Sequence, residues 1–253
     1  MSNGSGEAVR KGEGKVMVEK GQTIEIVSVN VGMPSVLLSR PAGDIVSGID
    51  KRPVVRSSLH LTVINLEGDG QADTKESRFG GQVHGGPDQA VYAFPVEHYA
   101  RFEAALERPV APGFVGENLT VRGATEAEVC IGDVWEWGEA LLQVSVPRSP
   151  CYKLGIRMGR QALRRWVREE GLVGWYLRVL RPGIVPTSGR IAVVERHPAG
   201  VSVLEAHRAI DGGGIGPEHL QNLAPLAMKA RRTLQVAGRD VTGGVPERDG
   251  KLV

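Results

Sequence analysis

The sequence lacks the features that mark several common classes of protein. Two cysteines, Cys130 and Cys151, occur in 253 residues, which is too few for a disulfide framework. Basic residues exceed acidic ones by two, 31 against 29, so the strong positive excess of many nucleic-acid-binding domains is missing. No apolar run approaches the roughly 18–20 residues that cross a bilayer. We therefore expect a cytoplasmic protein with reduced thiols that binds neither nucleic acid nor membrane.

The two ends of the chain differ from its middle in composition and in the pattern of apolar residues. Residues 1–22 are rich in Gly, Lys and Glu and lack the apolar core of a signal peptide, so they are predicted to be a flexible tail. From residue 198 onward the alternating apolar runs stop and helical signals take over. The predicted organisation is a tail over 1–22, a β domain over 23–197 and a small three-helix domain over 198–245.

Short apolar runs between glycines and prolines predict a mainly β fold. The sequence has 34 glycines and 15 prolines, and many of the runs alternate with the period of two that is typical of half-buried strands. Many short strands with glycine corners favour a closed barrel over a flat sheet. The predicted strands are Thr23–Asn30, Leu61–Leu66, Val91–Phe94, Leu119–Val121, Val129–Ile131, Ala140–Val146, Trp175–Leu180 and Arg190–Val194.

Helices are predicted beside the barrel and after it. Pro95 suits the start of one helix, because the N–H that proline lacks would have no partner there, and a second helix is predicted over Gly159–Glu170. In the C-terminal part, Ser202 and Glu205 form a capping box, Pro217 begins a further helix, and another covers Met228–Val236.

Four turns concentrate residue types that build sites. They are GIDKRPVVR (48–56), HGGPD (84–88), GENL (116–119) and PRSPCYK (147–153). The last is the most informative, because its cysteine follows a strongly predicted strand and lies close to Arg148 and Lys153. Neighbouring positive charge lowers the pKa of a thiol, and the thiolate is both a nucleophile and a soft metal ligand. From these residues alone, Cys151 could equally be a buried, inert cysteine.

The remaining candidates have ordinary structural explanations beside the functional ones. Cys130 lies within an apparent strand, where a core role is favoured. The basic turn could bind a phosphate or be a solvated loop, the glycines after His84 could admit a ligand or form a tight turn, and Asn118 could bind a heterocycle or serve the turn. The candidates outside the cysteine turn are Lys51, Arg52, Arg56, His84, Gly85, Asp88 and Asn118.

Taken in order, the motifs KRPV, VHGGPDQAVY, GENLTV, IGD, LQVSVPRSPCYKL, GWYLRVL and PGIVPTSGRI resemble the MOSC family. The family is named after the C-terminal domain of molybdenum-cofactor sulfurases, and its YiiM-like branch is the best match. The resemblance covers about residues 25–240. It implies a MOSC-type β-barrel with flanking helices, followed by a small C-terminal domain of three helices.

The resemblance also implies a molybdopterin cofactor whose molybdenum is bound by a cysteine thiolate, here Cys151. It places Asn118 near the pterin and Lys51 at the phosphate of the cofactor. His84 and Asp88 match the HGGPD motif and are candidate proton donors, and Gly85 lies in the same turn. Charge and proximity add Arg52, Arg56, Arg148 and Lys153 as cofactor-binding candidates.

The activity expected from the resemblance is the two-electron reduction of N-hydroxylated compounds, such as hydroxylaminopurines or amidoximes. Because no flavin or haem motif is visible, a separate reductase is expected to supply the electrons. A homodimer is also expected from the family. Two other functions stay open: a carrier that delivers cofactor or persulfide sulfur through Cys151, and a non-catalytic interaction module.

Overall fold

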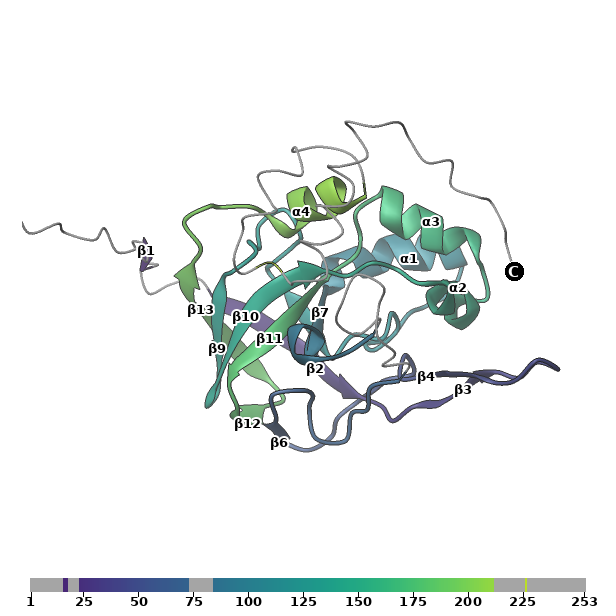
Figure 1. The fold of residues 1–253 in the computed structure, drawn as a ribbon, viewed down its shortest axis with the longest axis horizontal. Coiled ribbons are helices and arrows are strands. Elements are labelled where there is room, and N and C mark those ends of the chain that lie inside the picture. Colours follow the sequence, from purple (N-terminus) through teal and green to yellow (C-terminus); the bar gives the residue numbers. More distant parts are fainter. Residues whose placement is uncertain (1–15, 18–22, 73–83, 212–225, 227–253) are drawn as a thin grey trace, which may run out of the picture.

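The computed structural model describes residues 16–17, 23–72, 84–211 and 226, and a closed β-barrel lies at its centre (Figure 1). Seven strands form a ring in the order β13, β9, β10, β11, β7, β8 and β2, and β2 closes the ring by pairing with β13. This confirms the prediction of a mainly β, barrel-containing protein. The strands of the ring are β2 (Thr23–Val31), β7 (Val91–Pro95), β8 (Leu119–Arg122), β9 (Val134–Trp137), β10 (Ala140–Pro147), β11 (Trp175–Arg181) and β13 (Gly189–Arg196).

Several short strands lie outside the ring. β1 pairs with β13 and β5 pairs with β2 at the two ends of the sheet order, while β6 with β12 and β3 with β4 form separate two-stranded ribbons. The β3–β4 ribbon projects from the body of the molecule (Figure 1). These strands are β1 (Val16–Met17), β3 (Ser35–Leu38), β4 (Ile45–Ser47), β5 (Arg52–Pro53), β6 (Ser58–Leu61) and β12 (Gly183–Pro186).

Alternating apolar residues fill the barrel. In β10, Ala140, Leu142 and Val144 are buried while the intervening residues are partly exposed. Trp135 and Trp175 meet edge to face inside, with ring centroids 5.8 Å apart. Closure gives the ring strands neighbours on both sides, so few edges are left unpaired.

One pairing in the ring, between β7 and β8, is parallel. Two parallel strands need a crossover, and the chain supplies it with the 3-10 helix η2 (Val96–His98), helix α1 (Tyr99–Leu106) and the loop that follows. Both strands therefore begin at the same rim of the barrel. Strand β10 ends and β11 begins at this rim too, because Pro147 pairs with Trp175 and Tyr176 pairs with Tyr92.

Helices α1, α2 (Tyr152–Met158) and α3 (Ala162–Glu169) pack on one side of this rim. Their apolar faces share a second core around Phe94, Phe102, Leu154 and Leu163. The predicted helix over 159–170 is confirmed as α3. Helix α2 was not predicted, and Gly159, in the left-handed conformation at φ 69°, separates it from α3.

Two predicted strands are wrong, and local hydrogen bonds explain both. The run Leu61–Leu66 leaves the sheet after Leu61, because the Thr62 hydroxyl binds main-chain groups of Ile64 and Asn65 and forms a turn. The run Val129–Ile131 is a turn with an isolated bridge from Cys130 to Ser202. There the Asp133 carboxylate accepts a hydrogen bond from the main-chain N–H of Cys130, 3.0 Å away.

The C-terminal part is described as far as residue 211, together with Leu226. Helix α4 (Val203–Ile210) begins at the predicted capping box, in which Ser202 and Glu205 exchange hydrogen bonds. The helices predicted after Pro217 and over Met228–Val236, and the tail over 1–22 apart from Val16 and Met17, lie outside the described residues. Among the described residues, no helix combines the length and apolar character needed to span a membrane.

Candidate functional site

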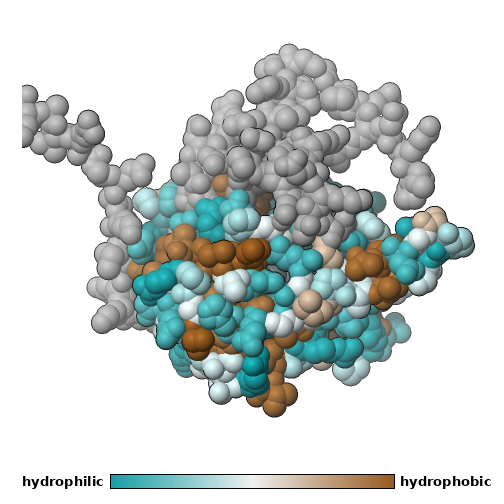
Figure 2. Space-filling model, turned by 60° about the horizontal axis from the view of Figure 1, so that its bottom comes forward, coloured by the Kyte–Doolittle hydropathy of each residue, from teal (hydrophilic) through white to brown (hydrophobic). Residues whose placement is uncertain are grey.

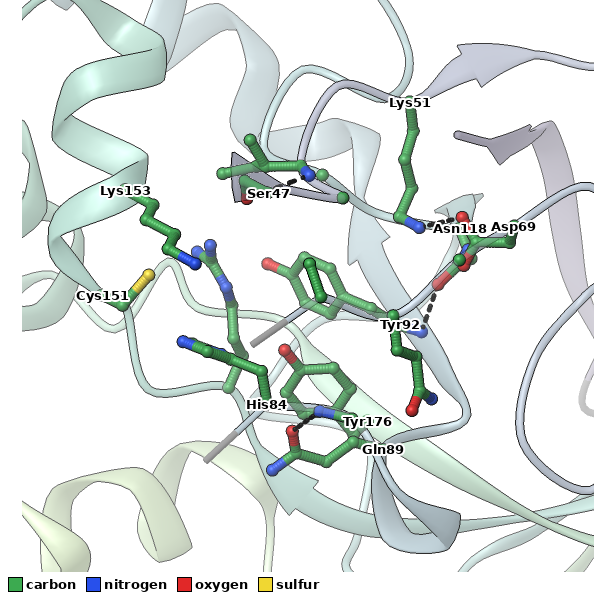
Figure 3. Close-up of a pocket in the computed structure, with 18 of the residues that line it drawn as sticks. Ser47, Lys51, Asp69, His84, Gln89, Tyr92, Asn118, Cys151, Lys153 and Tyr176 are labelled. Carbon is green, nitrogen blue, oxygen red and sulfur yellow. Dashed lines mark hydrogen bonds and ion pairs between the residues drawn. The ribbon is translucent and has the colours of Figure 1, made fainter. Parts of the chain in front are cut away.

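A cavity opens at the rim where β7, β8 and β11 begin and β10 ends (Figure 3). It gathers side chains from all four of the turns that the sequence singled out. Its charged lining, among the described residues, consists of three cations and one carboxylate, so the cavity favours an anion. The lining residues are Ser47, Gly48, Ile49, Lys51, Asp69, Gly70, Gln71, Ala72, His84, Gly85, Gln89, Ala90, Tyr92, Val115, Gly116, Asn118, Arg148, Ser149, Cys151, Lys153 and Tyr176.

Cys151 lies at the N-cap of α2, directly after β10 and the turn that follows it. Its side chain is partly exposed, and Figure 3 shows the sulfur directed toward the cavity between Lys153 and His84. The position follows from the sequence, because Pro147 ends the strand and Pro150 precedes the helix. The thiol is therefore open to a ligand and is not sealed in the core.

The surroundings of Cys151 favour its thiolate. Burial on its own raises the pKa of the thiol, but the hydrogen bond from His84 and the positive charge of Arg148 outweigh burial and lower the pKa to about 7. About half of the protein molecules then carry a thiolate at neutral pH. A thiolate is the form that binds a soft metal.

Arg148 is a buried cation beside this thiol. Its guanidinium carbon lies 5.1 Å from the centre of the Tyr92 ring, which is cation–π distance, and its side chain hydrogen-bonds Tyr176. The rings of Tyr92 and Tyr176 are themselves 5.2 Å apart. The two tyrosines thus hold the arginine in place with its charge at the cavity.

Lys51 and Asn118 lie across the cavity from Cys151, and both have protein partners. Lys51 is paired with Asp69, and burial lowers its pKa against the opposing influence of that carboxylate. The Asn118 amide accepts from the main-chain N–H of Tyr92 at 3.1 Å and donates to Asp69 and to the carbonyl of Asn30. Asn118 therefore links strand β7 to Asp69, the ion-pair partner of Lys51.

His84 begins a turn that two glutamines hold. The Gln89 side chain accepts from the main-chain N–H of Gly85 at 3.1 Å, and the Gln71 side chain accepts from that of Gly86 at 2.9 Å. Gly85 and Gly86 have φ values of 76° and 84°, in the region that favours glycine. These contacts fix the direction from which His84 approaches Cys151.

The wall between Gly113 and Glu117 is shaped by one buried carboxylate. Glu117 accepts hydrogen bonds from the main-chain N–H groups of Gly113 and Val115, at 2.8 and 3.1 Å, and from the hydroxyls of Tyr99 and Thr120. Burial raises the pKa of Glu117. Val115 and Gly116, which line the cavity, are placed by this network.

The structure brings seven of the predicted site residues to the cavity: Lys51, His84, Gly85, Asn118, Arg148, Cys151 and Lys153. The Lys153 ammonium donates to the carbonyl of Val46 at 2.9 Å and links α2 to β4.

Three predicted residues are not part of the described cavity lining. Arg52 is largely exposed and pairs with Asp50, and Arg56 is exposed and pairs with Glu67 at 2.7 Å. The Asp88 carboxylate pairs with Arg178 at 2.8 Å, while its main-chain carbonyl accepts from the Ser145 hydroxyl. The structure gives Asp88 the role of anchoring the turn to β10 and β11.

Sequence reasoning missed several residues that build the site. Asp69, Tyr92, Tyr176, Gln71 and Gln89 line the cavity but carry no local signal, because strand tyrosines and loop glutamines are common. The cluster around Asp69 depends on pairing between residues far apart in the chain. Glu117 was visible within the GENL motif, and its burial was the part that the sequence did not show.

Comparison with known proteins finds a family model and several relatives that are similar to this chain. A family model described as the MOSC domain matches residues 80–192. The protein YflK of Bacillus subtilis (strain 168), whose function is uncharacterised, is 42% identical over 189 residues, which cover 75% of this chain and 81% of YflK. The chain belongs to the MOSC domain family. Protein YiiM of Escherichia coli (strain K12) is 44% identical over 156 residues, covering 60% of this chain and 66% of YiiM.

The fold of this MOSC protein also agrees with that of its relatives. The crystal structure of YiiM from Escherichia coli matches it with a TM-score of 0.66 and 31% identity, over 90% of this chain and 98% of that one. A protein of Gibberella moniliformis (strain M3125 / FGSC 7600) that is named a reductase is 36% identical over 152 residues, which cover 57% of this chain and 27% of the reductase. The MOSC family associates the chain with the molybdenum cofactor.

The residues of the cavity fit such a cofactor. Within the described parts of the chain, no group of three or more His, Cys, Asp and Glu side chains could enclose a metal ion. A metal bound at Cys151 would have to bring most of its ligands with it, as molybdenum does in a pterin dithiolene complex. The same cavity offers Lys51, Arg148 and Lys153 to a phosphate.

Proposed function

We propose that this MOSC protein is an oxidoreductase that binds a molybdenum cofactor through Cys151 and reduces N-hydroxylated compounds such as hydroxylaminopurines or amidoximes. The observation that carries the proposal is a cysteine with a pKa of about 7 in a cavity with an excess of cations. A relative named a reductase, of which the match covers about a quarter, supports redox chemistry by its name.

The cofactor would supply two electrons for the removal of an oxygen atom from the substrate, and the protein would hold and surround the cofactor. Cys151 would bind the molybdenum as thiolate. Lys153, Arg148 and Lys51 would neutralise the phosphate, with Asp69 limiting the excess charge near Lys51. The buried Tyr92 ring and the partly buried Tyr176 ring would limit the access of water to the Arg148 side of the cavity.

The reaction consumes two protons and two electrons for each N–OH that becomes N–H, and it releases water. His84 is the described side chain best placed to deliver a proton, because it lies in the cavity and hydrogen-bonds the Cys151 sulfur. Asp88 was the other candidate from the sequence, and its ion pair with Arg178 makes it the weaker one.

The test begins with metal and pterin analysis of the protein purified from a host that makes the cofactor. The purified protein is then assayed with 6-hydroxylaminopurine and reduced benzyl viologen, and formation of adenine is measured. We expect about one molybdenum per chain and turnover that is lost in Cys151→Ser. Stoichiometric molybdenum without turnover would favour the carrier function, and absence of both molybdenum and pterin would contradict the proposal.

A further inference from the structure

The chain around Cys151 has an unusual distribution of charge. Between Glu139 and Glu169, residues 140–168 contain seven lysines and arginines and no aspartate or glutamate, although the whole chain is nearly neutral. We call this stretch the acid-free segment. It includes β10, the Cys151 turn, helix α2 and all but the last residue of helix α3.

Two of these cations border the Cys151 side of the molecule without a carboxylate partner among the described residues. The Arg164 guanidinium donates to the carbonyl of Pro150, next to Cys151, at 3.0 Å. The Arg160 guanidinium donates to the carbonyl of Ala105 at 2.6 Å. Because main-chain carbonyls are neutral, both side chains keep their full positive charge at an exposed surface.

A third arginine is only half neutralised. Arg157 pairs with Asp50 at 2.8 Å, and the same carboxylate also serves Arg52 at 3.3 Å. One negative charge thus faces two positive ones. Asp50 immediately precedes Lys51, so this excess of charge also lies near the cavity.

The β3–β4 ribbon next to helix α2 has one packed face and one exposed apolar face. Helix α2 packs against β3 and α3, and Lys153 ties it to β4. One face of the β3–β4 ribbon is packed through Leu37 and Ile45. On the other face, Val36 pairs with Val46, and these side chains are 53% and 43% exposed, with Met33 at 65%.

The arrangement is visible in two views. Figure 1 places α2 between α3 and the β3–β4 ribbon. In Figure 2 hydrophobic surface lies on the arm that projects to the right, beside hydrophilic surface. Tyr152, next to Cys151, adds a 45% exposed aromatic side chain. An exposed aromatic side chain beside several exposed cations is typical of a docking surface for a partner of opposite charge.

We infer that the surface formed by Arg157, Arg160, Arg164 and Tyr152 docks an acidic electron-carrier protein. The inference rests on the proposed reductase function, because a reductase without a redox group other than its active-site cofactor must receive electrons from a partner. Helix α2 begins at the metal-binding cysteine itself. A carrier bound on this surface would therefore place its redox centre close to the site that it reduces.

The first test is binding, which needs neither cofactor nor turnover. The probe is oxidised flavodoxin, a small acidic flavoprotein, titrated onto the full chain at low and at physiological ionic strength. We expect binding to weaken as salt is added. Arg160→Glu and Arg164→Glu should each weaken binding about tenfold, a size within the usual range of electrostatic steering. Val36→Ser, on the ribbon face opposite the packed one, should leave binding unchanged.

Two matched variants separate charge from geometry and from position. Arg164→Lys keeps the charge but loses the planar guanidinium, so it should bind nearly as well as wild type. Arg181 is exposed and also donates to a main-chain carbonyl, that of Glu139. It lies at the far end of β11 from the cavity, so Arg181→Glu should bind like wild type.

The second test compares two electron donors in turnover. For each variant, the rate with reduced flavodoxin is divided by the rate with reduced benzyl viologen, which needs no docking surface. The ratio should fall in Arg160→Glu and Arg164→Glu and stay constant in Arg181→Glu. No turnover with either donor in wild type contradicts the proposed function and leaves the binding result to decide on the surface. Absence of flavodoxin binding, or equal loss in Arg181→Glu, overturns the inference.

Discussion

The two cysteines show how differently one fold can treat the same side chain. Both are free thiols that lie outside the named strands and helices. Cys130 is buried beside the Asp133 carboxylate, and burial together with that negative charge raises its pKa. Cys151 lies beside His84 and Arg148 in an open cavity, and its pKa is lowered to about 7.

The difference indicates that charge and access, rather than local backbone, separate a thiol with a raised pKa from one with a lowered pKa. Each cysteine lies in a tight turn with main-chain hydrogen bonds nearby. At Cys130 the nearest carboxylate penalises the thiolate, and Arg196, which pairs with Asp133 at 3.4 Å, offsets this only in part. At Cys151 the cations and the histidine outweigh the cost of burial.

The largest difference between the two cysteines is expected when each sulfur is removed in turn. Cys151→Ser should reduce bound molybdenum to background and abolish reduction of 6-hydroxylaminopurine, because the hydroxyl does not supply a soft anionic ligand at neutral pH. Cys130→Ser should keep its molybdenum. Metal content of the two purified variants, each checked for folding by circular dichroism, measures the effect, and molybdenum retained in Cys151→Ser would refute the assignment.

The next largest effect is expected from His84, whose hydrogen bond is the strongest influence favouring the thiolate. In metal-free protein, the rate of iodoacetamide labelling against pH should give a midpoint near 7 for Cys151 and above 9 for Cys130. His84→Ala should raise the Cys151 midpoint by about one unit. The thiolate fraction at pH 7 then falls from about one half to about one tenth, so labelling slows about fivefold. An unchanged midpoint would contradict the contact.

A smaller change is expected from Arg148→Met. Removing the buried charge should raise the Cys151 midpoint by less than His84→Ala does, because the charge of Arg148 is the second influence after that hydrogen bond. Labelling of Cys130 should not respond. If both midpoints moved together, the variant would have altered the fold and not the local charge, and the near-ultraviolet circular dichroism of Tyr92 and Tyr176 would report it.

The smallest effect is expected at the other cysteine. Asp133→Asn removes the charge that raises the pKa of Cys130, so the labelling midpoint of Cys130 should fall while staying well above that of Cys151. Asp133 also accepts from the main-chain N–H groups of Cys130 and His197, at 3.0 and 3.2 Å. Weakening these bonds should lower the free energy of unfolding by about 1–2 kcal/mol, measured by urea denaturation. A rise in the Cys130 midpoint would be the contrary result.

Cys151 and Asp133 should make the free energy of unfolding depend on pH in opposite directions. For metal-free protein, the lowered pKa of Cys151 adds stability that is present above the ordinary thiol pKa and is lost as the pH falls toward 7. The raised pKa of Asp133 acts the other way: its contribution is favourable at low pH and is lost as the pH rises through its folded pKa. Comparing the unfolding free energy of Cys151→Ser with that of wild type between pH 6 and 9 isolates the contribution of Cys151.

The sequence was informative where a signal is local. Strands β2, β10 and β13 follow from alternation, α1 and α3 from apolar spacing, and the start of α4 from Ser202 and Glu205. The motifs around Lys51, His84, Asn118 and Cys151 pointed to one site, because their order resembles that of a known family. The lowered pKa of Cys151 was anticipated from Arg148.

The sequence was silent where the structure depends on distant residues. Nothing near Thr62 distinguishes a strand from a turn until its hydroxyl is seen to bind Asn65. Arg52 and Arg56 were grouped with Lys51 by proximity in the chain, but successive strand residues point to opposite sides, and both turn to solvent. Asn118 hydrogen-bonds Tyr92 and Asp69, which lie 26 and 49 positions away in the chain.

The parallel pairing of β7 with β8 has a consequence for how this protein can vary. Because both strands start at one rim, the distance between the HGG turn and the GENL turn is set by sheet register and not by the number of residues that connect them. The connecting segment around α1 can therefore lengthen or shorten, and it is a natural place for insertions. The two motifs that border the cavity can thus become more distant in sequence while staying neighbours in space.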